Sequence, residues 1–209
     1  MIDYSKIEST SAEPEASSMI ETFRAIGYSI ETAIADILDN SISAGARNIW
    51  IDYLWKGPYT IIGIMDDGCG MSNKELIQAM RPGSISPLTE REEHDLGRFG
   101  LGLKTASFSQ CRKFCVISKK DASESYWTWD LDYVNKEKAW KLIKYKPEEI
   151  DFLNQWNYLQ SGTTVLWWDI DRLTKDTHTD KESSKADFFA TFEKVKKHLS
   201  MVFHRYIEE

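Results

Sequence analysis

The sequence contains few cysteines and prolines and no long apolar runs. Its three cysteines are Cys69, Cys111 and Cys115, and no two of them form a C-x-x-C pair. This number and spacing indicate neither a disulfide framework nor a zinc site. We therefore expect reduced intracellular thiols that act as small core or turn residues.

No uninterrupted apolar run approaches the ~18 residues that a membrane span requires. The first residues, MIDYSKIESTSAEPEASS, lack the apolar region of a signal peptide. We expect a cytoplasmic protein with no membrane partner.

Basic residues are also in deficit, with 26 Lys and Arg against 33 Asp and Glu, a net charge of -7 and a pI of about 5.2. Proteins that wrap nucleic acid usually present a basic surface, so the balance argues against this role, although a local basic patch stays open. The 209 residues, 42% of them hydrophobic, fit one ordinary globular domain with a substantial core.

What the chain does contain is an alternation of helix and strand patterns without an internal repeat. We expect helices over residues 14–27, 30–44, 73–80, 101–110 and 186–207, with a helical insertion over 147–158. We expect strands over residues 48–54, 59–65, 113–119, 125–134, 140–145 and 163–169. Residues 81–96 are polar and too long for a routine connection, so they are expected to form a lid.

The predicted helix over residues 30–44 has two different sides. Its apolar side carries Ile34, Ile37, Leu38 and Ile42. Asp36, Asn40 and Ser43 fall within an arc of about 60° on the other side. If this side faces a cleft, Asn40 can offer its amide oxygen to Mg²⁺, and Asp36 can orient or deprotonate a water molecule. The alternative is a solvated face of a surface helix.

The second motif, Asp66-Asp67-Gly68-Cys69-Gly70-Met71, directly follows an apolar strand. A buried carboxylate at the strand end can accept the exocyclic amine of adenine, and the glycines let a flat ring approach the backbone. Guanine would present a carbonyl to the same carboxylate, so the motif favours adenine. The D-x-G-x-G register selects Asp66 for this role. The alternative is a tight turn before the next helix, which Ser72 and Glu75 begin with a capping box.

The third motif places Gly97, Gly100 and Gly102 ahead of a predicted helix. No P-loop string G-x-x-x-x-G-K-[ST] occurs in the chain, so any phosphate cradle must come from these glycines. Exposed N–H groups and the helix dipole would favour phosphate oxygens there, and Lys104 would add a positive charge. A glycine hinge is the alternative. The hydroxyl of Thr163, in the last predicted strand, could reach the adenine-binding carboxylate or its water.

Taken together, AIADILDNSISAGA (33–46), MDDGCGMS (65–72) and GRFGLGLK (97–104) resemble the GHKL superfamily of ATPases, which groups gyrase, the heat-shock chaperone, histidine kinases and MutL. They look most like its MORC and MutL branch. The resemblance implies an α/β Bergerat fold, a two-layer sandwich in which a mixed β-sheet packs against a helical layer that holds the ATP site.

The same resemblance implies a role for individual residues. It assigns Asp36 to catalysis, Asn40 to Mg²⁺, Asp66 to adenine and Thr163 to an adenine-side contact. It assigns the binding loops to Gly68, Gly70, Met71, Gly97, Gly100, Leu101, Gly102 and Lys104. This chain departs from the family at Asp36, where relatives usually have Glu, and at Ser43, where they usually have Asp. The shorter Asp36 is expected to slow hydrolysis.

The resemblance also suggests an organisation and a role. We expect an N-terminal helical segment over 1–29, the ATP-binding domain over 30–185 and a C-terminal helix over 186–209 that leads to further domains. ATP would drive a conformational and homodimerisation switch in a DNA-processing or restriction and defence system, with DNA contacted only by downstream domains. The alternatives are an ATP-sensing or chaperone-like module that does not hydrolyse ATP, and a histidine kinase, which the four histidines do not support.

Overall fold

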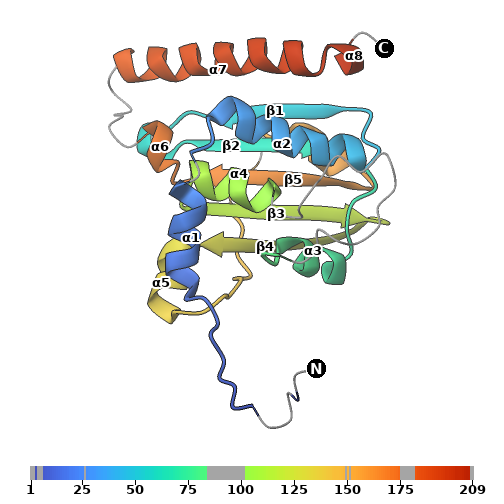
Figure 1. Ribbon diagram of the computed structural model, residues 1–209. Coiled ribbons are helices and arrows are strands. Elements are labelled where there is room, and N and C mark those ends of the chain that lie inside the picture. The colour runs from blue at the N-terminus through green and yellow to red at the C-terminus, as the bar shows by residue number, and fades with distance from the viewer. Residues whose placement is uncertain are drawn as a thin grey trace.

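The structure is a computed structural model that describes residue 3 and residues 7–25, 27–83, 102–148, 150, 152–174 and 182–207 (Figure 1). The described chain forms a sheet of five strands with helices packed on one of its faces. This arrangement confirms the expected two-layer α/β sandwich. None of the described helices is long and apolar enough to span a bilayer.

The sheet has the order β1-β2-β5-β3-β4. Its strands are β1 (Ile49–Leu54), β2 (Ile61–Asp66), β3 (Lys113–Lys120), β4 (Ser123–Asp130) and β5 (Gly162–Trp168). Every pairing among these strands is antiparallel, so the expectation of a mixed sheet was wrong in this detail. The reason is local, because short turns join β1 to β2 and β3 to β4 as hairpins, and β5 then inserts between them.

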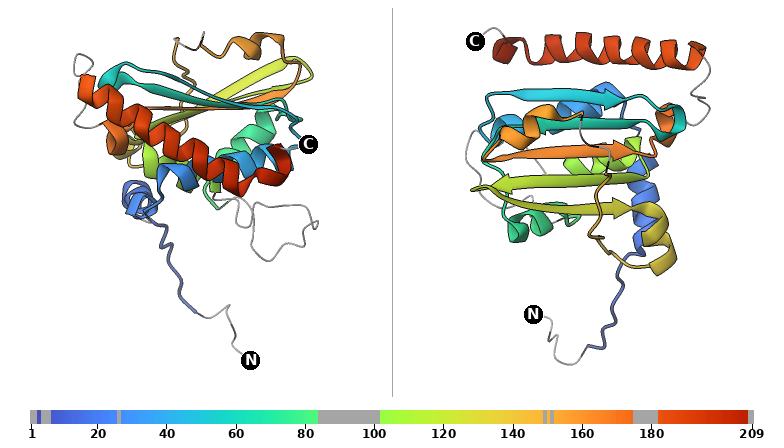
Figure 2. Two further views of the ribbon diagram at one scale, coloured as in Figure 1. Left: turned by 90° about the horizontal axis from the view of Figure 1, so that it is seen from above. Right: turned by 180° about the vertical axis from the view of Figure 1, so that it is seen from behind.

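The helical layer consists of α1 (Ala16–Ala25), α2 (Ile30–Ser43), α3 (Asn73–Met80) and α4 (Gly102–Gln110). Smaller helices, α5 (Leu131–Glu137) and α6 (Asp171–Thr174), follow β4 and β5. The long helix α7 (Glu182–Val202) lies beside α2 along the β1 edge of the sheet, and the short α8 (His204–Ile207) ends the described chain (Figures 1 and 2). Tyr53 on β1 packs its ring against Phe188 and Phe192 of α7.

Apolar side chains are buried on both faces of the sheet. The larger cluster lies between the sheet and the helices and includes Ile34 and Leu38 of α2 together with Phe108 of α4. The second cluster lies on the opposite face, where Leu153 and Trp156 pack over the sheet. This cover contains the 3₁₀ helix η3 (Asn154–Tyr158), while another 3₁₀ helix, η2 (Gly57–Tyr59), lies in the β1–β2 connection. Figure 2 shows the covering segment from behind.

Most expected elements are confirmed, and α3 begins with the capping box that Ser72 and Glu75 predicted. Four expectations were wrong in whole or in part. The strand over 125–134 ends at Asp130, because the Asp130 side chain accepts hydrogen bonds from the first amides of α5. Residues 140–145 make a single bridge, between Ile143 and Thr128, instead of a strand. The insertion over 147–158 contains only η3, and the C-terminal helix is divided at Phe203.

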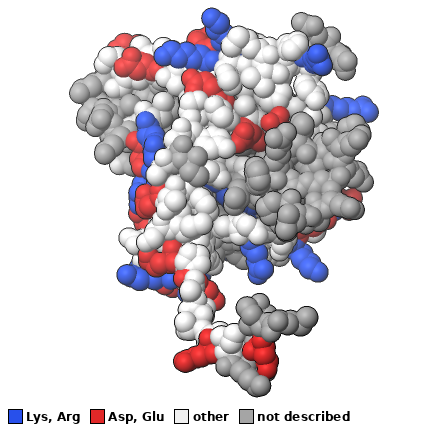
Figure 3. Space-filling view, in the orientation of Figure 1, with Lys and Arg blue, Asp and Glu red and all other residues white. Residues whose placement is uncertain are grey.

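The face that carries the helices has a mixed charge. Lys and Arg side chains lie interspersed with Asp and Glu on the part of this face that the structure describes (Figure 3). Such a pattern presents no continuous basic stripe among those residues, in line with the net charge of -7.

One buried arginine ties α1 to the rest of the helical layer. Arg24 is 5% exposed, and its guanidinium donates to the carbonyl oxygens of Phe108 and Cys111 at the C-terminal end of α4, at 2.8 and 2.9 Å. It also pairs with Asp171 of α6. These carbonyls have no partner within their own helix, so Arg24 satisfies groups that would otherwise be buried without a donor.

We predict that Arg24→Met lowers the free energy of unfolding by about 2 to 3 kcal/mol, the usual effect of losing hydrogen bonds from a charged donor. Glu21→Gln is the matched control, because Glu21 pairs with the same guanidinium at 3.6 Å but is 63% exposed. That variant should change stability by less than about 1 kcal/mol. Chemical denaturation of both variants checks this, and equal losses would contradict the role assigned to Arg24.

Candidate functional site

The centre of the site is the carboxylate of Asp66, at the last position of β2. Asp66 is 6% exposed. Its Oδ1 atom accepts from the amides of Gly68 at 2.9 Å and Thr163 at 3.1 Å, and its Oδ2 atom accepts from the Ser41 hydroxyl at 2.8 Å. Three separate elements, α2, β5 and the loop after β2, therefore converge on one side chain.

Burial raises the pKa of Asp66, and the hydrogen bonds from Gly68, Ser41 and Thr163 act in the opposite direction. These donors favour the ionised carboxylate, an acceptor-only group with about four lone-pair positions. Because the described donors take three of them, the carboxylate retains capacity for one further donor.

The neighbouring Asp67 has a different role. Its carboxylate accepts from the amides of Arg47 and Asn48 and from the Asn48 side chain, all at 2.8 to 2.9 Å. Desolvation by partial burial is the largest single effect and raises the pKa of Asp67, but the hydrogen bonds from Asn48 and Arg47 together outweigh it, so the pKa is lowered. Asp67 thus holds the loop against the start of β1. The two aspartates therefore have different hydrogen-bond partners, in line with the D-x-G-x-G register that distinguished them.

The loop after Asp66 passes very close to other backbone segments. A Cβ atom on Gly70 would lie 1.7 Å from the Lys119 carbonyl oxygen, and Gly70 has φ +64°. The next amide, that of Met71, donates to the Ser118 hydroxyl at 2.8 Å. Ser118 in turn donates to the Gly162 carbonyl and lies 3.0 Å from the Thr163 hydroxyl. The loop is thereby held against β3 and β5 beside the Asp66 carboxylate.

Asp36 and Asn40 lie one turn apart on α2. The Asn40 amide nitrogen donates to the Asp36 carbonyl at 2.8 Å, which leaves the amide oxygen as the atom available to a cation. Asp36 Oδ2 lies 3.8 Å from the position that a Cβ of Gly102 would take, so its carboxylate sits beside the N-terminus of α4. Tyr28 hydrogen-bonds the same carboxylate, and this bond lowers the pKa of Asp36. Desolvation is the larger effect, so the pKa of Asp36 is raised.

Lys104 is 2% exposed and donates from Nζ to the Ala79 carbonyl at the end of α3, at 2.7 Å. Burial lowers its pKa to about 8. The ammonium group of Lys104 thus links α4 to α3. It is partly desolvated, and this desolvation is the cause of its lowered pKa. In this geometry the Lys104 ammonium is directed at the protein backbone, and its contact with a phosphate stays a prediction.

The structure brings Asp36, Asn40 and Gly102 together at one end of the site and Asp66, Gly68, Gly70, Met71 and Thr163 at the other. Gly97, Gly100 and Leu101 lie outside the described residues, as does the expected lid from residue 84 onward. In the part of the chain that is described, no cluster of three or more His, Cys, Asp or Glu residues could hold a metal. The assignment of the Asn40 oxygen to Mg²⁺ stays a prediction.

Sequence reasoning missed Ser41, Ser118 and Tyr28. Ser41 follows Ile34 by seven residues and Ile37 by four, so it is a hydroxyl within the apolar stripe of α2. Ser118 continues the alternation of Phe114 and Val116 toward the helices. In both cases the detectable signal was a small polar residue at a position that the periodicity assigns to the core. Tyr28 precedes its helix and carried no such signal.

Comparison with known proteins bears on this arrangement. The family model for the histidine kinase-, DNA gyrase B- and HSP90-like ATPase matches residues 28–163, more than half of the chain. ATPase morc-1 of Caenorhabditis elegans is 33% identical over 90 residues, which are 43% of this chain and 10% of that protein. DNA mismatch repair protein MutL of Dictyoglomus turgidum is 30% identical over 95 residues, 44% of this chain and 16% of that protein. The aligned segments are thus a small part of these relatives.

We predict that Gly70→Ala destabilises the fold by about 3 to 5 kcal/mol, because the left-handed backbone and the overlap with the Lys119 carbonyl act together. Gly45→Ala is the matched control: Gly45 has φ +73°, but a Cβ there would meet nothing within 4 Å. It should cost only the backbone strain of about 1 to 2 kcal/mol. Thermal and denaturant unfolding of both variants measure the difference, and equal costs would show that the close approach at Gly70 is not constraining.

Proposed function

Because the chain belongs to the histidine kinase-, DNA gyrase B- and HSP90-like ATPase family, we propose that it binds ATP with Mg²⁺ and hydrolyses it slowly. The observation that carries the proposal is the buried Asp66 carboxylate, held at a strand end by Ser41, Gly68 and Thr163. MORC and MutL relatives place the chain in one branch of this family.

Adenine recognition rests on the remaining acceptor capacity of Asp66. Its described donors fix both oxygens, so the carboxylate cannot rotate to accommodate a different hydrogen-bonding pattern. The exocyclic amine of adenine supplies the missing donor, whereas the guanine carbonyl would place two acceptors against each other. Gly68 and Gly70 keep side chains away from the plane of the base.

The phosphate end lies where α2 meets the N-terminus of α4. Asn40 would hold Mg²⁺ through its amide oxygen, the hard type of donor that this cation prefers, and the ion would supply charge neutralisation for the phosphates. The first amides of α4 point out of its N-terminus toward the side of Asp36 and favour an anion there. Lys104 adds a positive charge close by.

Asp36 would position or deprotonate the attacking water. Desolvation raises its pKa, which makes the carboxylate a better proton acceptor, and the Tyr28 hydroxyl restrains its orientation. Its side chain is one methylene shorter than the Glu expected at this position from the family resemblance. The base would therefore stand farther from the terminal phosphate, which supports slow turnover.

We further propose that nucleotide binding drives a conformational and dimerisation switch. The relative named DNA mismatch repair protein MutL supports a place in a DNA-processing system. A restriction or defence system is the context that the sequence resemblance suggests. Contact with DNA would then fall to parts of the protein beyond this domain. Within this domain, Arg24 of α1 hydrogen-bonds the C-terminal end of α4, and the N-terminus of α4 would face the phosphates. A shift of α4 on nucleotide binding would therefore reach α1 directly.

A second candidate function is ATP sensing without hydrolysis, and the shortened Asp36 is the observation that favours it. Steady-state phosphate release by the purified chain separates the two functions. Turnover that exceeds the background and requires Mg²⁺ supports the ATPase, whereas ATP binding without turnover supports the sensor.

We predict that Asp66→Asn weakens ATP binding by about 1 to 3 kcal/mol, because an amide presents a donor to the adenine amine and disturbs the three existing bonds. Asp67→Asn is the matched control, since Asp67 bonds only to the β1 side of the loop among the described residues. It should leave the affinity nearly unchanged. Isothermal calorimetry with ATP measures both, and an unchanged affinity in Asp66→Asn would remove the adenine assignment.

We predict that Asp36→Ala retains ATP binding but loses turnover, because it removes the group that positions water and none that holds the base or the phosphates. Asp36→Glu restores the missing methylene and should raise turnover. Asn40→Ala should instead lose the Mg²⁺-dependent part of the affinity. Phosphate release and calorimetry with and without Mg²⁺ distinguish these results. Wild-type turnover in Asp36→Ala would contradict its catalytic role.

A further inference from the structure

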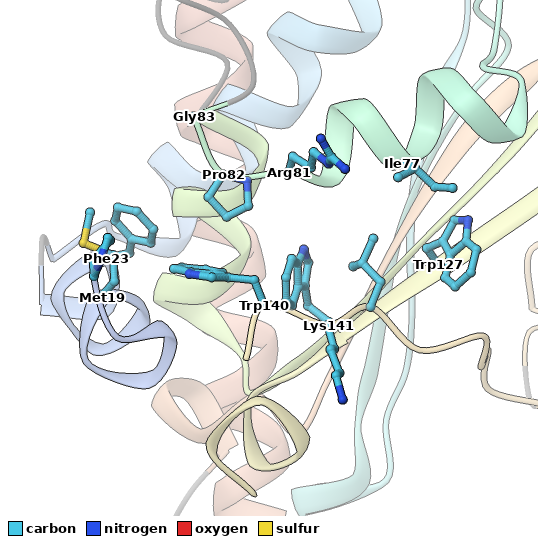
Figure 4. Close-up of a pocket in the computed structure, with 12 residues that line it drawn as sticks. Met19, Phe23, Ile77, Arg81, Pro82, Gly83, Trp127, Trp140 and Lys141 are labelled. Carbon is cyan, nitrogen blue, oxygen red and sulfur yellow. The ribbon is translucent and has the colours of Figure 1, made fainter. Parts of the chain in front are cut away.

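A large cavity lies away from the residues of the ATP site. It has a volume of about 790 Å³ and opens between α1, the C-terminal end of α3, β4 and the segment at residues 140–142 (Figure 4). β4 is the edge strand farthest from β1, and two strands separate it from β2, which carries Asp66. The size is within the range of cavities that hold small organic ligands.

Three indole rings line this cavity, those of Trp127, Trp129 and Trp140. The Trp127 indole N–H donates to the Asn73 side chain at 2.9 Å and that of Trp129 to the Met80 carbonyl at 3.1 Å. Because these polar edges are already satisfied within the protein, Trp127 presents apolar ring surface to the cavity, and Trp129, which is 2% exposed, forms part of its buried wall. Trp140 stands nearly perpendicular to Trp129, with ring centroids 6.0 Å apart, and is 36% exposed.

Phe23 of α1 and Ile77 of α3 close the cavity from two other sides. Figure 4 shows the labelled rings and Ile77 around a common space, with Arg81 at its border. Flat aromatic surfaces set at steep angles to one another suit a planar ring, which can stack on one indole and meet the edge of another. An aliphatic chain would gain less from this geometry.

The charge at the border is positive. Arg81 is exposed and has no acidic partner among the residues described, so its guanidinium is available to an anion. Lys141, the other cation of the lining, pairs with Glu137 at 2.8 Å, and its side chain points away from the cavity in Figure 4. The ammonium of Lys144 lies 4.8 Å from the Trp127 ring centroid and adds positive charge nearby.

We propose that this cavity is a ligand site, separate from the ATP site, for a small planar aromatic molecule that carries one anionic group. The ring system stacks among Trp127, Trp129 and Trp140, and the anion pairs with Arg81 at the border. A guanidinium can hold a carboxylate or sulfonate through two parallel hydrogen bonds, which gives the ligand a fixed orientation.

Two fluorescent probes of the same shape test the proposal on the full chain. The first, 1-anilinonaphthalene-8-sulfonate, has an aromatic ring system and one negative charge. The second, N-phenyl-1-naphthylamine, lacks the sulfonate. We expect saturable binding of one equivalent of each probe, with the anionic probe bound more tightly, and energy transfer from tryptophan to the bound probe.

Arg81→Gln should weaken binding of the anionic probe about threefold to fivefold, the effect of one partly exposed charge pair, and should leave the neutral probe unchanged. Ile77→Trp should fill the cavity and weaken both probes, and Trp140→Ala should weaken both by removing a stacking surface. Lys138→Gln is the matched control, because Lys138 is an exposed cation outside the lining and should change neither.

Without nucleotide, Asp66→Asn should leave probe binding unchanged, so the result does not depend on the proposed ATPase function. Failure of wild-type protein to bind either probe would overturn the proposal. So would equal affinities for the two probes, weaker probe binding in Asp66→Asn without nucleotide, or undiminished binding in both Ile77→Trp and Trp140→Ala.

Discussion

The arrangement of this domain depends on one buried carboxylate and the donors that hold it. Asp66 ends β2, yet its oxygens are bonded to a helix hydroxyl at Ser41, to its own loop at Gly68 and to the neighbouring strand at Thr163. An ionised group is costly to bury unless its hydrogen bonds are nearly complete. The fold therefore fixes α2, β5 and the loop relative to one another, and the carboxylate keeps capacity for one further donor, which we propose is the adenine amine. The same bonds that secure the fold thus define the site.

A second constraint is the close approach of backbone segments around this carboxylate. Gly70 lies against the Lys119 carbonyl, and a Cβ on Gly162 would lie 2.2 Å from the Asp66 carbonyl oxygen, with φ +148°. Because Gly70 and Gly162 have no side chain, the backbone at the ends of β2, β3 and β5 can approach closely. At the other end of the site, α4 is anchored through its C-terminal carbonyls by Arg24, while its N-terminus lies beside Asp36. The helix is therefore held at its C-terminal end by Arg24 of α1, and its N-terminus is the place where we propose that the phosphates bind.

Much of this was accessible from the sequence, because periodicity and capping are local. The helical spacing of apolar residues predicted α2, the mostly apolar run over 59–65 predicted β2, and the capping box of Ser72 and Glu75 predicted the start of α3. The D-x-G-x-G register distinguished Asp66 from Asp67. The failures concern tertiary relations. Residues 140–145 have strand composition, but among the described residues their backbone-to-backbone hydrogen bonds to β4 are made at Ile143 alone. Ser41 and Ser118 became visible as site residues only once the strand order put them next to Asp66 and the loop, and the tryptophan-lined cavity needs elements that are distant in the chain.

The account is tested most directly by a crystal structure of the protein with a non-hydrolysable ATP analogue and Mg²⁺. It predicts that the adenine amine donates to Asp66, that the Asn40 amide oxygen or a water bound to it ligates the metal, and that the phosphates lie at the N-terminus of α4. An analogue bound with its base away from Asp66, or a guanine nucleotide bound equally well in the same position, would contradict it.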